Sequence, residues 1–180
     1  LAMMLCLMRK ISYANSLVKS GKWDFRLMHP VHRHQVQTMG ILGIGRIGGA
    51  MAHKTHALGM KVIAHDPYVS PENVPDYVTL VSFDELLAQS DVLSVHCPLS
   101  ESTRYILNEQ KLGLMKPSAY LINTARGSIV DEAALDKMLA EKRLAGAAMD
   151  VFSVEPGSPS HPLFRHENFL CTPHMAWHSE

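Results

Sequence analysis

Three glycines, Gly43, Gly45 and Gly48, follow the spacing G-x-G-x-x-G between two contrasting segments. Residues 38–42 form a short apolar run typical of a strand, and residues 47–58 are rich in Ala, Met and Leu, as in a helix. In this context the first glycine allows a tight turn, the second lets a ligand approach the backbone, and the third permits close packing of helix on strand. The pattern is weak alone, but at a strand-to-helix turn it predicts a pyrophosphate site.

An acidic residue farther along the chain refines the identity of that ligand. Asp66 ends a second apolar run, 61–65. A carboxylate at this distance from the glycines accepts hydrogen bonds from the ribose hydroxyls of NAD, and it repels the additional phosphate of NADP. The backbone N–H groups of Arg46 and Ile47, at the positive end of the helix dipole, would face the phosphates. The agreement of strand, helix and acid predicts an NAD site and disfavours a glycine-rich turn without a cofactor.

Several polar residues, His96, Arg126, Asp150 and His174, each follow a predicted strand, and Glu155 lies shortly after Asp150. Ligands of parallel sheets bind beyond the carboxyl ends of the strands. Arg126 can hold a carboxylate through its planar fork, and His174 can exchange a proton with a carbonyl oxygen. Glu155 can fix the tautomer of the imidazole. Beside a nicotinamide these residues predict reversible oxidation of a hydroxy acid, although a loop cap or a surface acid is the alternative for Arg126 or Glu155 alone.

The elements that must position these residues alternate along the chain. Further strands are expected at 78–81, 91–95, 119–123, 146–150 and 168–172, and further helices after a Ser82 cap and at 108–114 and 131–142. Strands separated by helical segments favour βαβ crossovers and a parallel sheet. The sequence therefore predicts an α/β fold, a Rossmann-type doubly wound parallel sheet in three layers, α/β/α.

Length and composition agree with one globular domain. The chain has 180 residues, of which 47% are hydrophobic and 19% charged. Because the 17 basic residues equal the 17 acidic residues in number, no net charge favours nucleic acid or an anionic membrane as a partner. The cysteines are odd in number and far apart, which predicts reduced thiols in a cytoplasmic protein; they are Cys6, Cys97 and Cys171.

The N-terminal segment predicts a helix. Residues 1–8 are apolar but too few to span a bilayer, and the basic residues after them are misplaced for a signal peptide. Residues 1–18 are expected to form one amphipathic or largely buried helix, which belongs to the core or seals against a second subunit. Its start without a capping residue favours a fragment of a longer protein. No metal site is predicted, because no Cys or acid completes the nearby histidines, which are His29, His32 and His34.

Six ordered segments carry a resemblance to a known family: 40–48, 64–68, 96–99, 123–127, 150–156 and 172–176. Over essentially all 180 residues the chain resembles the NAD-binding domain of the D-isomer-specific 2-hydroxyacid dehydrogenases. The resemblance implies Arg126, Glu155 and His174 as catalytic residues and a 2-oxo or 2-hydroxy acid as substrate. It implies cofactor contacts at Gly43, Gly45, Arg46, Ile47, Gly48, Asp66, His96, Cys97, Pro98, Thr103, Thr124, Ala125, Asp150 and Ala176.

The same resemblance bears on domain organisation. Residues 1–180 are expected to form the NAD-binding domain, with 1–20 as an entering helix available for homodimer or interdomain contact, and the family's smaller substrate domain is absent from this sequence. Trp177 is similar to the branch that contains hydroxypyruvate or glyoxylate reductases and the C-terminal-binding-protein co-repressors, and the segment 171–180 particularly resembles the co-repressors. The alternative function is therefore an NAD(H)-sensing, co-repressor-like binding protein. Neither the acid that is used nor the preferred direction follows from these residues.

Overall fold

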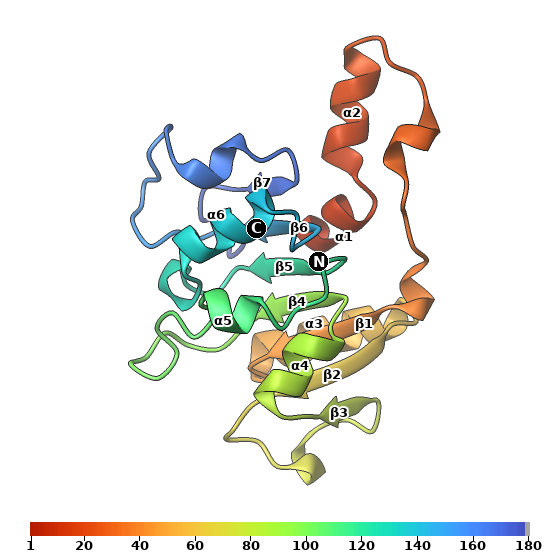
Figure 1. Ribbon diagram of the computed structural model, residues 1–180. Coiled ribbons are helices and arrows are strands. Elements are labelled where there is room, and N and C mark those ends of the chain that lie inside the picture. Colours follow the sequence, from red (N-terminus) through yellow and green to blue (C-terminus); the bar gives the residue numbers. More distant parts are fainter. Residues whose placement is uncertain (179–180) are drawn as a thin grey trace.

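A computed structural model of the chain describes residues 1–178 and shows one continuous sheet (Figure 1). All seven strands are parallel, in the order β3-β2-β1-β4-β5-β6-β7. The strands are β1 (Thr38–Leu42), β2 (Lys61–His65), β3 (Val78–Leu80), β4 (Val92–Val95), β5 (Tyr120–Asn123), β6 (Gly146–Met149) and β7 (Phe169–Cys171). The helices are α1 (Ala2–Met8), α2 (Ile11–Lys19), α3 (Arg46–Ala57), α4 (Phe83–Gln89), α5 (Glu109–Leu112) and α6 (Glu132–Ala140).

Two apolar clusters, one on each face of the sheet, define three layers. On one face α1 and α3 contribute Met4, Met8 and Met51 to a cluster with alternate residues of the strands. On the other face α4, α5 and α6 bury leucines against the intervening strand residues. Both faces are covered, which is the usual state of an all-parallel sheet. The predicted Rossmann-type α/β/α fold and the predicted strand ranges are confirmed, with element ends moved by one or two residues.

Local sequence explains where the helices begin. Ser82 accepts a hydrogen bond from Glu85 N, and the Glu85 carboxylate accepts one from Ser82 N, which completes the capping box that the predicted Ser82 cap requires. Asp131 caps α6 by accepting from Ala133 N and Ala134 N. These caps satisfy the first N–H groups of helices that pack on the sheet, and such caps stabilise a helix by about 1 kcal/mol each.

The predicted single helix over residues 1–18 is wrong, because the chain breaks between α1 and α2. Lys10 adopts a left-handed backbone conformation with φ of 52°, which is uncommon for a residue other than glycine. Its Nζ donates to His29 O at 3.3 Å, so the break is tied to a distant segment. Met4 and Met8 bury α1 against β5 and β6, whereas α2 has no buried residue and projects from the molecule (Figure 1).

Several features of the described residues bear on partners and ligands. Cys6, Cys97 and Cys171 are all free thiols. Within residues 1–178, no helix has the length and apolar character needed to cross a membrane, and no three His, Cys, Asp or Glu side chains gather as metal ligands. Residues 156–161 form a loop without helix or strand, mostly exposed, before a 3-10 helix at Pro162–Arg165. The last two residues, Ser179 and Glu180, lie outside the described residues, and so does that end of the 171–180 resemblance.

His96, which follows β4, makes the fold sensitive to acid. Burial lowers the pKa of His96 to about 4, and its Nε2 lies 2.8 Å from Ser94 Oγ. Between pH about 6.5 and about 4 the unfolded chain therefore takes a proton at this residue that the folded chain does not. We expect the free energy of unfolding to fall over this range by on the order of 3 kcal/mol on account of His96. Urea unfolding at several pH values measures this loss.

A His96→Gln variant isolates this contribution, because glutamine does not titrate. Its stability should depend less on pH over the same range, whereas the same substitution at the exposed His32 should leave the pH dependence as in the natural chain. Identical pH profiles for the His96→Gln and His32→Gln variants would contradict the assignment.

Candidate active site

The glycine turn packs where the strand order reverses, between β1 and β4. Gly43 has φ of +89°, and a Cβ placed there would lie 2.6 Å from Cys97 N. A Cβ on Gly48 would lie 2.1 Å from Gly43 O, so the packing of α3 on the turn also requires glycine. By contrast, a Cβ on Gly45 would meet no atom within 4 Å. Two of the predicted glycines thus serve packing, and Gly45 faces open space at the position where ligands bind to doubly wound sheets.

Beside the turn, two backbone donors and one carboxylate are arranged for a ligand. The N–H groups of Arg46 and Ile47, in the first turn of α3, have no acceptor among the described residues. Asp66, at the end of β2, accepts hydrogen bonds from Ile44 N and Tyr68 N, each at 3.0 Å. Since a carboxylate offers about four acceptor positions, Asp66 can bind ligand hydroxyls while it remains tied to the turn.

The loop after β4 forms the neighbouring wall. Burial raises the pKa of the Cys97 thiol to about 11, so this cysteine stays protonated and is not a nucleophile. His96 precedes it and is neutral near pH 7 for the reason given above. Thr103 Oγ1 donates to Pro98 O at 2.7 Å and accepts from Ser100 N at 2.7 Å. The hydroxyl of Thr103 therefore holds the loop together, and the predicted cofactor residues Pro98 and Thr103 belong to one tight turn.

A buried asparagine shapes the loop after β5. Asn123 is fully buried; its Nδ2 donates to Arg126 O and its Oδ1 accepts from Ala125 N, each at 3.0 Å. Arg126 is exposed, and its Nη1 donates to Ala125 O at 2.6 Å. The guanidinium makes no hydrogen bond to the other two predicted catalytic residues. Thr124 lies in the same loop, and its side chain bonds to no protein group among residues 1–178.

The buried carboxylate of Asp150 organises the loop after β7. It accepts hydrogen bonds from Thr172 Oγ1, from Met175 N at 2.9 Å and from Ala176 N at 2.8 Å. The backbone oxygen of Asp150 accepts from His174 N at 2.8 Å. His174 has φ of 52°, a left-handed conformation that is strained for a side chain with a Cβ. Asp150 and Ala176, both predicted cofactor residues, therefore meet directly, and their contact fixes the backbone on either side of His174.

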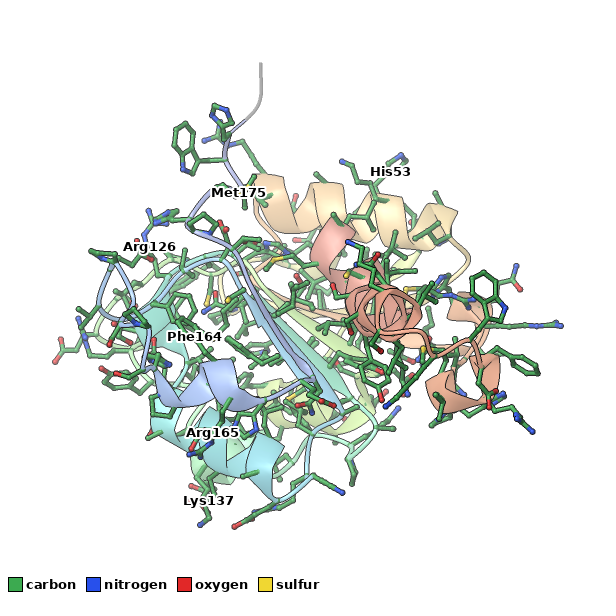
Figure 2. The ribbon with its side chains drawn as sticks, turned by 90° about the horizontal axis from the view of Figure 1, so that it is seen from above. His53, Arg126, Lys137, Phe164, Arg165 and Met175 are labelled. Atoms are coloured by element: carbon green, nitrogen blue, oxygen red, sulfur yellow. The ribbon has the colours of Figure 1, made fainter. Side chains whose placement is uncertain are left out.

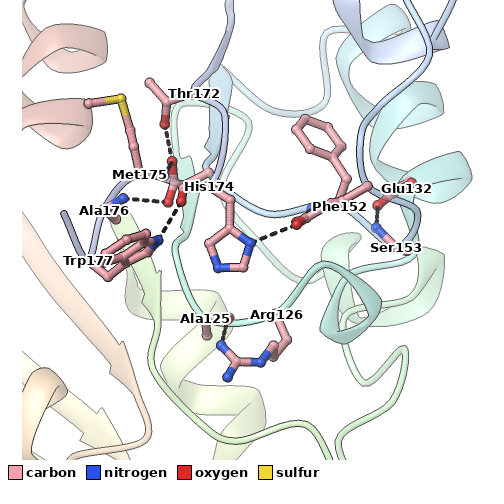
Figure 3. Close-up of polar contacts among 12 residues, drawn as sticks. Ala125, Arg126, Glu132, Phe152, Ser153, Thr172, His174, Met175, Ala176 and Trp177 are labelled. Atoms are coloured by element: carbon pink, nitrogen blue, oxygen red, sulfur yellow. Dashed lines mark hydrogen bonds and ion pairs between the residues drawn. The ribbon is translucent and has the colours of Figure 1, made fainter.

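His174 and Glu155 form the expected pair. His174 Nδ1 lies 2.7 Å from Glu155 Oε2, and Glu155 Oε1 accepts from Phe152 N at 2.8 Å. Partial burial would raise the pKa of Glu155, but the hydrogen bonds from His174 and Phe152 outweigh it and hold the pKa below its usual value. An ionised carboxylate only accepts hydrogen bonds, so the proton resides on Nδ1, and Nε2 is left free of this contact. The ring points toward the side chain of Arg126 (Figure 3).

The structure thus joins Glu155 to His174 and Asp150 to Ala176, and it places Gly43 against Cys97. Arg126 makes no hydrogen bond to His174 or Glu155. It does lie on the same side of the molecule as Met175, the neighbour of His174, and away from Lys137 (Figure 2). Sequence reasoning missed Asn123 and Glu132, which bond to the loops that carry predicted catalytic residues. Asn123 could have been found as the polar last residue of an apolar strand. Glu132 gave no signal, because it looks like an ordinary acid in the first turn of a helix.

Comparisons with known proteins agree with this geometry. Residues 1–176 match the family model described as "D-isomer specific 2-hydroxyacid dehydrogenase, NAD binding domain". The chain is 41% identical over 177 residues to a D-3-phosphoglycerate dehydrogenase of Archaeoglobus fulgidus, a match that covers 98% of this chain and 33% of the relative. It is 39% identical over 181 residues to a glyoxylate reductase of Thermofilum pendens, covering 97% of this chain and 53% of the relative.

A solved structure of a D-lactate dehydrogenase with NAD+ from Lactobacillus jensenii is similar in fold, with a TM-score of 0.90 and 31% sequence identity. That match covers 99% of this chain and 57% of the other. The chain therefore spans about a third to somewhat more than half of the relatives that it matches. On the family model, the curated relatives and the fold together, the chain belongs to the NAD-binding domain family of the D-isomer-specific 2-hydroxyacid dehydrogenases.

Proposed function

We propose that this chain is the cofactor-binding part of an NAD-dependent D-2-hydroxyacid dehydrogenase, which transfers hydride reversibly between NAD(H) and a 2-oxo or 2-hydroxy acid. The observation that carries the proposal is the 2.7 Å contact between His174 Nδ1 and Glu155 Oε2, which leaves Nε2 available at the carboxyl edge of the sheet. Family membership supports it, since the matched relatives are named as dehydrogenases and reductases. No observation favours the co-repressor-like alternative.

The residues around the glycine turn fit an NAD molecule. Gly45 leaves open space for the pyrophosphate, and the unpartnered N–H groups of Arg46 and Ile47 can donate to it. Asp66 supplies acceptors for the ribose hydroxyls of NAD and a charge that opposes the phosphate of NADP. In this proposal the remaining predicted contacts would support or line the cofactor site; they are Gly43, Gly48, His96, Cys97, Pro98, Thr103, Thr124, Ala125, Asp150 and Ala176. Bound NAD(H) would supply or accept the hydride.

In this proposal each catalytic residue has a separate task. His174 Nε2 gives a proton to the carbonyl oxygen of a 2-oxo acid as hydride reaches C2, and in the reverse direction it takes the hydroxyl proton. Glu155 holds the ring by Nδ1, keeps Nε2 aimed at the substrate and stabilises the imidazolium of the protonated state. Arg126 exchanges its intraloop bond with Ala125 O for the substrate carboxylate. A guanidinium that is exposed and held only by its own loop can make this exchange.

We further propose that a separate substrate domain completes this site and that residues 1–180 form the cofactor domain of a homodimer in the cytoplasm. Three free cysteines support a reducing compartment. The dimer is supported by apolar side chains exposed on α2 and the segment after it: Ile11 is 56% exposed, Trp23 87% and Phe25 77%. Large exposed apolar side chains on α2 and on the segment that follows it support an interaction surface there.

Substitution of His174 tests the chemistry. His174→Asn, in the protein at its natural length, should reduce turnover of 2-oxo acids by roughly 10²–10⁴-fold, because the proton donor is lost. NADH affinity, followed by fluorescence titration, should change little, because the side chain acts on the substrate. A panel of glyoxylate, hydroxypyruvate, phosphohydroxypyruvate and pyruvate identifies the acid. Normal turnover in this variant would refute the mechanism.

Substitution of Asp66 tests cofactor selection. Asp66→Ala should weaken NADH binding by roughly 10- to 100-fold through loss of charged hydrogen bonds, and it should weaken NADPH binding much less. NADPH serves as the internal control, since Asp66 also holds the turn through Ile44 N and a general collapse of the turn would affect both cofactors. Equal losses would show that Asp66 does not select the cofactor.

Substitution of an exposed aromatic residue tests the dimer. Trp23→Ser should shift sedimentation of the chain toward a monomer, because it removes apolar area from the proposed interface. Tyr68→Ser is the matched control, because Tyr68 is also a large aromatic residue, is 90% exposed, and follows β2 rather than α2. A natural chain that sediments as a monomer at micromolar concentration would refute the dimer.

A further inference from the structure

The backbone at Phe152 and Ser153 is contacted by groups from two loops and from helix α6. A Cβ on Gly127 would lie 2.0 Å from Phe152 C and 2.3 Å from Ser153 N, so the loop that carries Arg126 rests directly on this peptide. Phe152 N, which belongs to the preceding peptide, donates to Glu155 Oε1 at 2.8 Å. Ser153 N donates to Glu132 Oε1 at 2.7 Å (Figure 3). The position of these two consecutive peptides therefore bears on the placement of all three predicted catalytic residues.

Glu132 holds the Phe152–Ser153 peptide from α6 and has a second partner. Its Oε2 lies 3.2 Å from His161 Nε2. Leu163 N donates to His161 Nδ1 at 3.3 Å, so the ring proton is on Nε2 and points at Glu132. The side chains of Glu132 and His161 are 17% and 18% exposed, which is less than those of Glu155 and His174, at 35% and 43%. The Glu132–His161 contact is thus better shielded from water than the contact between Glu155 and His174.

The position of Glu132 in α6 does not require this arrangement. An acid in the first turn of a helix normally interacts with the helix dipole or the free N–H groups. In α6 the carboxylate of the preceding residue, Asp131, already accepts from Ala133 N and Ala134 N. Both oxygens of Glu132 are directed instead to Ser153 and His161, which lie outside the helix.

We propose that Glu132 is a positioning residue for the reaction, which holds the Phe152–Ser153 peptide where Glu155 reaches His174 and where the Arg126 loop packs. This inference rests on the proposed function for its kinetic consequence. Glu132 touches neither substrate nor cofactor in this scheme and acts through the loop. A carboxylate suits this position because both partners of Glu132 donate and each reaches a different oxygen. Glutamine would set its own NH₂ donor against one of these two donors.

Turnover is the first measurement, made on the protein at its natural length with the 2-oxo acid that it reduces. Glu132→Ala should lower kcat by about 10- to 100-fold, since small displacements of catalytic groups have effects of this size. The KM for NADH should stay within about twofold, because the glycine turn lies on other strands. Glu132→Gln should fall between the natural protein and Glu132→Ala. Glu109→Ala is the matched control, since Glu109 is also an acid in a first helical turn with a 2.6 Å ion pair to Lys137.

The second measurement reads the position of His174 without turnover. In the 180-residue chain with ¹⁵N-labelled histidine, two-bond ¹H–¹⁵N spectra should show the His174 ring with its proton on Nδ1. Glu132→Ala should shift His174 toward a mixture of tautomers, because Glu155 is no longer held, and Glu109→Ala should not. A purely structural role would lower the melting temperature while it left kcat and this tautomer unchanged, and that result would overturn the proposal.

The two measurements separate this inference from the proposed function. If no 2-oxo acid is reduced but the His174 tautomer responds to Glu132→Ala, the proposed reaction fails and the positioning contact stands. If turnover is normal in the natural protein and neither kcat nor the tautomer responds, Glu132 is not a positioning residue. A change in kcat without a change in tautomer would also overturn the inference, because it would mean that Glu132 acts by another route.

Discussion

The parallel register of the seven strands is the constraint on which the site depends. Parallel strands need crossover connections, so every strand of this sheet ends at the same edge and every polar residue that follows a strand is delivered there. The order of strands reverses between β1 and β4, and the turn at Gly43 meets the loop at Cys97 at that point. Neither the pairing of β1 with β4 nor the approach of Gly43 to Cys97 joins residues that are near each other in the sequence. The geometry of the site follows from strand order, and the side chains then decide its chemistry.

Asp150 shows how this edge can hold a strained residue. A left-handed backbone at His174 costs about 1–3 kcal/mol, and a buried carboxylate without partners would cost several more. The three donors that Asp150 receives from the 172–176 loop are charge-assisted, each contributing about 1.5–3 kcal/mol. Their sum exceeds the strain. The same bonds that compensate the buried charge therefore fix the direction of the imidazole, so stability and site geometry have one origin at this position.

Much of this could be predicted from the sequence because the signals are local. Apolar runs give the strands, and the glycine spacing gives the turn. Three features were not predictable. Lys10 breaks the first helix through a bond to His29 O, with no glycine or proline to indicate it. Asp131 and Glu132 are adjacent acids; Asp131 caps its own helix through local N–H groups, whereas only a tertiary partner, Ser153 N, shows that Glu132 holds the loop of Glu155. Arg126 has the predicted position, but its guanidinium bonds to its own loop.

The exposure of the catalytic pair indicates where substrate choice resides. The side chains of His174 and Glu155 are 43% and 35% exposed, and charge interactions in contact with water are weak. Covering this side would exclude water and strengthen each of them. Relatives named for different acids, a phosphoglycerate dehydrogenase and a glyoxylate reductase, match the chain at 41% and 39% identity. The chain is thus about equally similar to relatives named for different acids, and overall similarity does not point to either acid. Under the proposed function, discrimination between acids would therefore come mainly from the groups that cover the open side, and this fold would contribute the proton donor and the carboxylate clamp that every such substrate requires.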